Sequence, residues 1–377
     1  MNPITALKTE EITLNMGPQH PSTHGVIRFI LKTDGEIVHE CEPDVGYLHR
    51  GIEKISEKVE WQGFIPYTDR VDYLAAMNCN WAYSLAVERL AGIEVPRRAE
   101  LIRVIVGELG RITSHLIGNG ALALDIGAAT PFTHAIRDRE MVNDLFERIC
   151  GARLTFSFVR PGGVAYDTPP GWVEDVVEFL DYFEPRLDTF DNLITYNKIF
   201  TGRLAGVAVI DTETAIDYGL VGPNLRGSGF RFDLRRDEPY GLYPELDFEV
   251  PVGSGMIGKL GDCWDRYYVR MCEMRESIKI LRQACKMIAG EPSAYTAKVK
   301  KILKPPKGEV YVRSENPRGE MGFYLVSDGT QNSVRTRIRT GSFSAMGIFP
   351  KVAKGLMVAD LIAVIASLDI VAPEIDR

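Results

Sequence analysis

Two histidines near the start of the chain, His20 and His24, lie four residues apart in the stretch 16–25. Their spacing suits one face of a helix, but the two prolines and two glycines of this stretch argue against a helix. We therefore expect a short, stiff loop that holds imidazoles at one spot. Two histidines are too few ligands to define a metal site. Metal binding, proton transfer and hydrogen bonding within a turn are all open from these residues alone.

Asp125 is an acid in the otherwise apolar run 121–127, so we expect it to be buried or nearly so. A buried carboxylate needs a partner or a raised pKa. A histidine is a natural partner, and its own pKa would then rise.

Tyr73 closes a charged stretch that contains Asp69, Arg70 and Asp72. It is either a phenol donor or a plain core residue. Arg50 is a candidate for holding an anionic group, with a surface ion pair as the ordinary alternative.

The segment from Gly253 to Leu260 nearly matches a phosphate-binding loop. Its last position is Leu260, so the hydroxyl that would hold Mg²⁺ is missing. We interpret it as an irregular glycine loop.

The bulk composition narrows the function classes. The chain has 377 residues, 45% hydrophobic and 25% charged, which is typical of a folded globular protein. A net charge of −7 argues against a primary nucleic-acid role.

The six cysteines form no Cys-x-x-Cys pair, so neither a zinc ribbon nor a cluster-binding motif is expected. Reduced thiols in the cytoplasm are the simplest interpretation. The first twenty residues have no signal-peptide core, and no apolar run is long enough to span a membrane.

Local patterns predict how these residues are positioned. Strands are expected at 11–15, 26–32 and 36–41, with a turn at Asp34-Gly35, so the histidine loop joins two strands of a small antiparallel sheet. Periodic apolar positions then predict helices over 52–58, 73–90, 96 onwards with an interruption at Gly118 and Gly120, 131 onwards, 172–192, 211–218 and 262–289. A break is expected at 202–206. The segment 219–261, with 9 glycines and 4 prolines, is expected to be irregular and to cover a site or contact a partner.

Strands return at 308–313, 322–327 and 334–340, and a last helix is expected at 353–368. The predicted fold class is α+β, with a mainly helical bundle core and small antiparallel sheets near the N-terminus and in the C-terminal part. We expect three regions: 1–50 with the histidine loop, 51–304 with the helical core, and 305–377 with a hairpin, helix and tail.

Several longer motifs together resemble the 49-kDa subunit (the D subunit) of respiratory complex I, the NADH–quinone oxidoreductase. The motifs are 16–28, 46–54, 66–73, 125–128, 222–229, 261–267, 317–320 and 367–371. They cover nearly the whole chain, and the family is also similar to the large subunits of nickel–iron hydrogenases.

The resemblance implies specific roles. The family forms one wall of a quinone cavity, and by motif position His24 and Tyr73 bind and protonate the quinone head group while Asp125 pairs with His24. Arg50 corresponds to an arginine near the terminal iron–sulfur cluster. The remaining cavity- or cluster-adjacent positions are His20, Arg70 and Asp72.

The same resemblance implies the setting. No cofactor is bound directly; menaquinone or ubiquinone binds at the interface, and the iron–sulfur cluster belongs to the neighbouring subunit. The expected partners are the terminal-cluster subunit (the B subunit), the C subunit and the membrane-arm quinone-channel subunit, at the cytoplasmic face of the bacterial inner membrane. The alternatives are the same subunit in a ferredoxin- or deazaflavin-dependent complex, a hydrogenase-like large subunit, or a purely structural scaffold.

Three departures from related patterns matter, and one is the segment from Gly253 to Leu260, which looks like an insertion before Gly261. The positions of the four hydrogenase metal-binding cysteines correspond to Asp72, Ala75, Val371 and Glu374, so no metal is expected in this chain. Many family members have a histidine, which tunes the cluster potential with pH, where Thr155 stands. This departure implies a cluster potential that depends little on pH, consistent with a low-potential quinone such as menaquinone.

Overall fold

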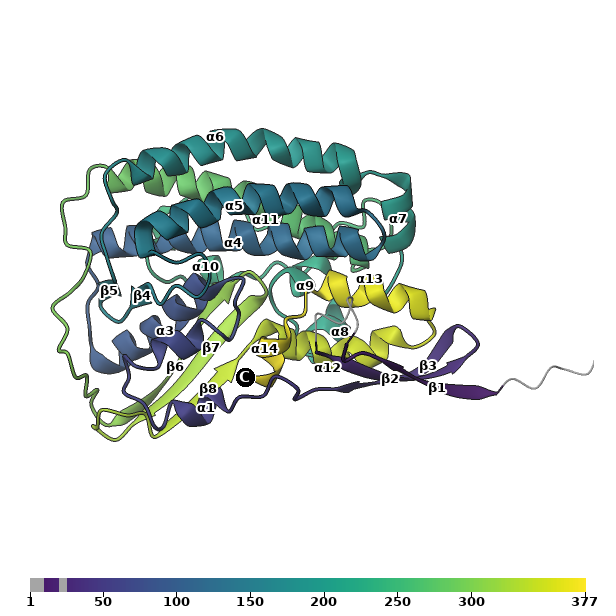
Figure 1. The fold of residues 1–377 in the computed structure, drawn as a ribbon, viewed down its shortest axis with the longest axis horizontal. Coiled ribbons are helices and arrows are strands. Elements are labelled where there is room, and N and C mark those ends of the chain that lie inside the picture. The colour runs from purple at the N-terminus through teal and green to yellow at the C-terminus, as the bar shows by residue number, and fades with distance from the viewer. Residues whose placement is uncertain (1–9, 20–25) are drawn as a thin grey trace, which may run out of the picture.

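The computed structural model describes residues 10–19 and 26–377. Both loop histidines, His20 and His24, lie outside these ranges. Within the described ranges the fold is α+β, as predicted, with a helical layer on one side and two three-stranded antiparallel sheets on the other (Figure 1). No helix in this part of the chain is long and apolar enough to cross a membrane.

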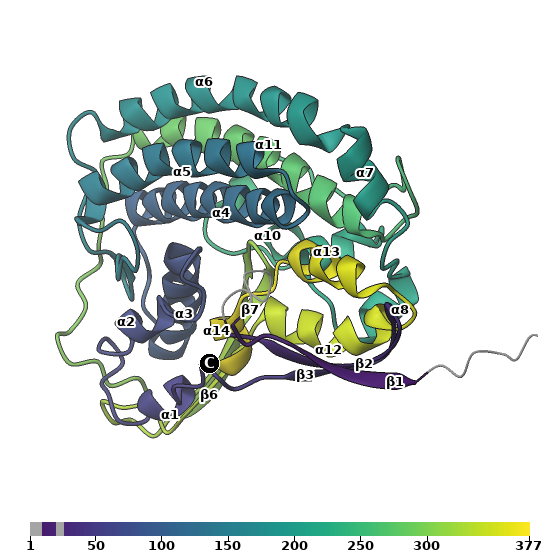
Figure 2. The same ribbon diagram turned by 45° about the vertical axis from the view of Figure 1, so that its right-hand side comes forward.

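The helical layer is built on two long helices, α4 (Arg97–Asp125) and α11 (Cys263–Ile288). Helix α5 (Ala129–Cys150) packs against α4, and α6 (Trp172–Phe190) covers α5 and α11, as Figures 1 and 2 both show. A short π-helix, η2 (Asp191–Thr195), leads from α6 into α7 (Lys198–Leu204). Asp262 caps α11 by accepting a hydrogen bond from the backbone N–H of Asp265 at 2.9 Å.

The expected interruption of α4 at Gly118 and Gly120 is wrong, because the helix runs through both glycines to Asp125. The glycines allow close packing instead. A Cβ at Gly118 would lie 2.8 Å from Asp369 Oδ1, and one at Gly120 would lie 3.1 Å from the Ala135 side chain. Tertiary contacts therefore outweigh the helix-weakening tendency of glycine here.

The predicted N-terminal sheet is confirmed as β1 (Glu11–Met16), β2 (Arg28–Asp34) and β3 (Ile37–Asp44), paired antiparallel in that order. Gly35 makes the β2–β3 turn with φ +58°. The histidine loop therefore connects two neighbouring strands.

The C-terminal sheet consists of β6 (Gly308–Asn316), β7 (Gly319–Ser327) and β8 (Arg335–Arg339), again close to the predicted strands. Helix α3 (Ala76–Ala91) packs against β6 and β7. Short helices α1 (Ile52–Ile55) and α2 (Ile65–Thr68) precede it, and a small hairpin, β4 (Val159–Arg160) with β5 (Gly163–Val164), follows α5.

The prediction for the C-terminal helix is wrong in its bounds. Helix α12 (Gly341–Ala353) precedes α13 (Val358–Leu368), and α14 (Ala372–Asp376) ends the chain. Gly355 separates α12 from α13 with φ +83°, and the proline and glycines inside α12 concealed that helix in the sequence. The predicted break at 202–206 begins only after Leu204, at Ala205.

The segment 219–261 is mostly irregular, as predicted, with short helices α9 (Gly222–Gly227), α10 (Leu234–Asp237) and η3 (Tyr243–Glu245), and α8 (Thr212–Asp217) just before it. The backbone N–H groups of its glycine loop at 253–260 bind side-chain carboxylates at the start of α11. The backbone N–H of Gly255 donates to Asp265 Oδ2 at 2.9 Å, and that of Lys259 donates to Asp262 Oδ2 at 2.9 Å.

Candidate functional site

Tyr73 lies in the loop between α2 and α3, and 36% of the residue is exposed. Asp72, the preceding residue, is fully buried and anchors this loop to the protein interior. Asp72 Oδ1 accepts a hydrogen bond from the backbone N–H of Leu74 at 3.1 Å, and Asp72 Oδ2 pairs with Arg318 Nη1 at 2.6 Å. The charged stretch therefore points one residue inward and the next, Tyr73, toward the surface.

Arg318, in the β6–β7 turn, holds three parts of the chain together. Besides Asp72, it donates to Ser114 Oγ on α4 at 3.1 Å, to the Asp369 carbonyl at 3.0 Å and to Asp369 Oδ1 at 3.3 Å. Asp369 ends α13 with φ +53°. We call Asp72, Arg318, Asp369 and Glu374 the Arg318 cluster.

Glu374 of α14 completes this cluster. Its Oε2 accepts hydrogen bonds from the backbone N–H and the hydroxyl of Ser342, at the start of α12. Burial and the neighbouring Asp72 raise the pKa of Glu374 to about 8, although Arg318 acts in the opposite direction.

The pKa of Tyr73 is raised above its usual value, chiefly by burial. Arg318 lowers it, while Asp72 and Asp369 raise it. Tyr73 is therefore protonated at neutral pH and lies within electrostatic reach of the Arg318 cluster. A protonated phenol at a partly exposed position can donate a proton to a bound molecule.

Asp125 is the last residue of α4 and is half-buried, which corrects the expectation that it is buried or nearly so. The neighbouring residues are mostly apolar, but α4 ends at Asp125, so part of its final turn is exposed. Asp125 follows Gly118 by seven residues, so it lies about two turns further along the same face of α4, the face that contacts Asp369. Its pairing with His24 involves a residue outside the described ranges.

Arg50 and Arg70 lie together on the outer side of the loop. Arg50 Nη2 donates to the Arg70 carbonyl at 2.9 Å, and both residues line an apolar cavity of 330 Å³. Burial lowers the pKa of Arg50, and the positive charge of Arg70 lowers it further. Two guanidinium groups at one apolar cavity favour an anionic neighbour.

Asp69 connects this loop to the segment that contains Thr155. It is buried and accepts hydrogen bonds from the backbone N–H of Ser157 at 2.9 Å and from its hydroxyl at 2.7 Å. Burial raises the pKa of Asp69 to about 6. Thr155 and Ser157 both have positive φ, +55° and +47°, so Asp69 holds a strained turn beside the Tyr73 loop.

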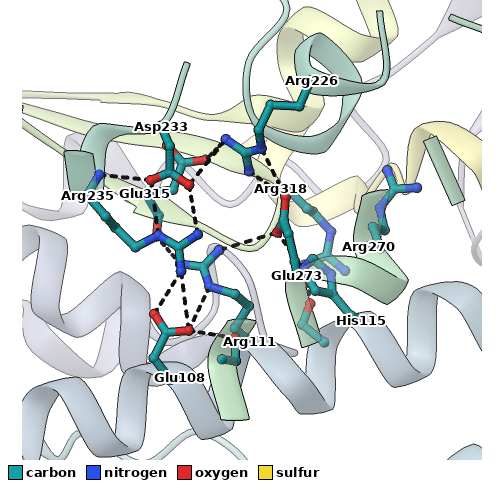
Figure 3. A network of polar contacts seen from close by, with 12 residues as sticks. Glu108, Arg111, His115, Arg226, Asp233, Arg235, Arg270, Glu273, Glu315 and Arg318 are labelled. Carbon is teal, nitrogen blue, oxygen red and sulfur yellow. Dashed lines mark hydrogen bonds and ion pairs between the residues drawn. The ribbon is translucent and has the colours of Figure 1, made fainter. Parts of the chain in front are cut away.

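A larger buried network lies behind the Arg318 cluster, between α4, α11, β6 and the irregular segment (Figure 3). Glu273 is its centre: Arg226 Nη2 donates to Glu273 Oε1 at 2.7 Å, and His115 Nε2 lies 2.8 Å from Glu273 Oε2. Burial raises the pKa of Glu273, but Arg226 and His115 outweigh this effect and hold that pKa well below its usual range. Burial lowers the pKa of His115, so it is neutral at pH 7.

The other half of the network is centred on Glu108. Arg235 Nη1 donates to it at 3.1 Å, the Tyr243 hydroxyl at 2.6 Å and the Ser277 hydroxyl at 2.6 Å. Glu315 joins the two halves: Arg226 Nη1 donates to its Oε1 at 2.8 Å, and Arg111, which pairs with Glu108, donates to its carbonyl at 2.7 Å.

No sequence pattern predicted a role for Arg318, Asp369 or Glu374, or for the network behind them. One signal was present for the network. Arg266, Arg270 and Glu273 recur at intervals of four and three in the α11 segment, a spacing that places all three on one face of a helix. Their burial shows that this is the core-facing side.

Two of the four positions expected for hydrogenase cysteines, Asp72 and Glu374, lie in the Arg318 cluster, and Ala75 and Val371 are buried. The described residues bring together no group of three or more histidines, cysteines or acids that could hold a metal ion. A guanidinium group lies among the carboxylates instead.

The comparisons with known proteins agree with this fold and these motifs. The model of the family described as respiratory-chain NADH dehydrogenase, 49 Kd subunit, matches residues 125–305 and 295–377. The chain belongs to this family of oxidoreductase subunits.

Curated relatives match almost end to end, and each is a D subunit of an NADH-quinone oxidoreductase. The D subunit numbered 1 of Anaeromyxobacter sp. (strain K) is 58% identical over 371 residues, covering 98% of this chain and 97% of the relative. The D subunit numbered 2 of Sorangium cellulosum (strain So ce56) is 57% identical over 369 residues, covering 98% and 95%. The D subunit of Bacillus anthracis is 50% identical over 370 residues, covering 98% and 100%.

Proposed function

We propose that this chain forms part of the quinone-reduction site of a proton-pumping NADH:quinone oxidoreductase. The observation that carries the proposal is the position of Tyr73, a protonated and partly exposed phenol fixed on a buried ionic cluster, in a chain of the 49-kDa subunit family. Quinone reduction requires two electrons and two protons. Tyr73 and His24 supply the protons to the two ring oxygens.

The electrons come from an iron–sulfur cluster in the neighbouring subunit and need no ligand from this chain. Arg50 and Arg70 form the cationic face toward that cluster. Asp69, which holds the Thr155 turn, directly precedes Arg70 in the chain. With threonine in place of histidine, we expect a cluster potential that varies little with pH, which suits menaquinone better than ubiquinone.

Proton donation changes the charge balance at the end of α4. When His24 gives up its proton, Asp125 loses a cationic partner. At a half-buried position the electrostatic energy of this change is larger than in bulk water, and it can start a conformational change that drives pumping.

Tyr73→Phe tests the proposed site directly. Phenylalanine keeps the ring but has no proton to donate, so we expect quinone reductase activity to fall about 100-fold. NADH:ferricyanide activity, which draws electrons upstream, should remain. The measurement is steady-state turnover of the assembled complex with each acceptor.

Tyr166→Phe is the matched control, since Tyr166 is an exposed tyrosine (58%) between β5 and α6, in a different segment from the Tyr73 loop. Full quinone reductase activity in Tyr73→Phe, together with no labelling of the Tyr73 loop by a photoreactive quinone, would assign the chain a purely structural role.

Asp125→Asn separates reduction from pumping. Asparagine preserves the size of the side chain and removes its charge, so we expect the complex to assemble but proton translocation per quinone reduced to fall. The measurement is the ratio of vesicle acidification to quinone reduction. An unchanged ratio would remove Asp125 from the coupling mechanism.

We further propose that the chain is a peripheral subunit at the cytoplasmic face of the membrane, in contact with the terminal-cluster (B) and C subunits and with the membrane-arm quinone-channel subunit. An NADH-binding flavoprotein encoded beside it would fix the electron donor. A ferredoxin- or deazaflavin-linked subunit there would replace NADH without altering the quinone site.

A further inference from the structure

The Arg318 cluster contains more buried negative groups than guanidinium groups. Its three carboxyls belong to Asp72, Asp369 and Glu374, all at most 4% exposed. Among the described residues, the cations that pair with these carboxyls are Arg318 and Arg270, and Arg270 Nε lies 3.8 Å from Asp369 Oδ2. Arg270 also interacts with the Glu273 network behind it. If all three carboxyls were ionised, one negative charge would be uncompensated in a buried place, which is costly.

Among the described residues, Glu374 is the carboxyl of this cluster that forms no ion pair. Asp72 and Asp369 both form ion pairs with Arg318, whereas no ion pair within the described ranges involves Glu374. Its Oε2 accepts two hydrogen bonds from Ser342, and its Oε1 is buried without a hydrogen-bond partner among the described residues. An ionised carboxylate would leave that oxygen unsolvated, and a proton removes the charge.

We infer that Glu374 carries a proton in the working enzyme, and that loss of this proton suppresses proton donation by Tyr73. Glu374 is thus a positioning residue for the charge around Tyr73 and does not touch the quinone. The inference rests on the function proposed above for Tyr73.

The groups facing Glu374 come from every element packed around it. They are Asp72 of the Tyr73 loop, Arg318 of the β6–β7 turn, Ser342 of α12 and Cys79 of α3. Asp69 acts on Cys79, and Asp369 pairs with Arg318. Most of these are acidic or neutral, in agreement with the raised pKa of Glu374, about 8.

The direction of the effect follows from the charge. While Glu374 keeps its proton it is neutral, and Asp72 and Asp369 balance Arg318 and Arg270. When Glu374 ionises at alkaline pH, the cluster gains a negative charge. Like Asp72 and Asp369, that charge raises the pKa of Tyr73 further, which makes its hydroxyl a weaker acid and a poorer proton donor.

Glu374→Gln tests the inference, because glutamine imitates the protonated acid at every pH. The measurement is quinone reductase activity of the assembled complex from pH 6 to 9.5, divided at each pH by NADH:ferricyanide activity. For the unaltered protein we expect this ratio to fall about tenfold between pH 7 and pH 9, as one group titrates. For Glu374→Gln we expect it to fall by no more than about twofold over the same range.

Glu320→Gln is the matched control. Glu320 is a buried carboxyl on β7 that pairs with Arg313 and Arg339 outside the cluster, so its variant should keep the alkaline fall. Ser342→Ala is a second, milder test. It removes a donor to the carboxylate form of Glu374, so the alkaline fall should move to higher pH.

The inference is overturned if Glu374→Gln keeps the alkaline fall of the unaltered protein, or loses activity equally at all pH values. Should Glu374→Gln fail to assemble, an unmoved pH profile in Ser342→Ala overturns it as well. Failure of the proposed function gives a different result, because Tyr73→Phe would then retain quinone reductase activity.

Discussion

Replacing Arg318 with methionine should lower the free energy of unfolding of this protein by about 3–5 kcal/mol. Arg318 is 3% exposed and is the cation that contacts both Asp72 and Asp369. Methionine fills similar space but leaves two buried carboxylates without their shared partner. It also removes donors to Ser114 and to the Asp369 carbonyl, which connect the β6–β7 turn to α4 and α13.

The expected signs are a low steady-state level of the assembled complex and a lower midpoint of thermal inactivation. Arg337→Met provides the comparison. Arg337 lies on β8 of the same sheet and pairs with Glu53, but its side chain is 62% exposed, so its loss should cost less than about 1 kcal/mol. Equal effects in the two variants would show that the cluster contributes no more than a surface ion pair.

Glu273→Ala should be comparably damaging, at about 3–5 kcal/mol. It leaves the buried guanidinium of Arg226 with fewer acidic partners and removes the acceptor of His115. The network in Figure 3 joins α4 and α11 to the irregular segment, so we expect 219–261 to become susceptible to proteolysis before the helices unfold. Limited proteolysis of the complex, followed by mass mapping of the first cleavage sites, measures this.

Glu276→Ala is the control on the same helix, three residues later. Glu276 pairs with the exposed Lys279 and accepts one backbone hydrogen bond, so its loss should cost only about 1 kcal/mol. First cleavage outside 219–261 in Glu273→Ala would contradict the assignment of the network as the anchor of that segment.

The sequence by itself determined the elements whose residues alternate or recur in a regular pattern. The strands of both sheets and the helices α4, α5, α6 and α11 follow from the spacing of apolar residues, because that spacing reflects which face of each element is buried. Long local motifs identified the family, and with it the loop that carries Tyr73.

The tertiary structure alone decided how charged residues combine. Asp72 and Glu374 lie far apart in the chain, yet both interact with Arg318. Arg318 is 246 residues from Asp72, and nothing in the local sequence around an aspartate indicates a buried partner at that separation. A charged residue in a sequence is typical of a surface, so the cores around Arg318 and Glu273 were missed. For the same reason Gly118 suggested a break in α4: only the approach of Asp369 explains why a side chain is absent there. The periodicity of apolar residues shows which face of a helix or strand is buried. Ion pairing depends on the distances between different helices and strands, and only the folded structure determines these distances.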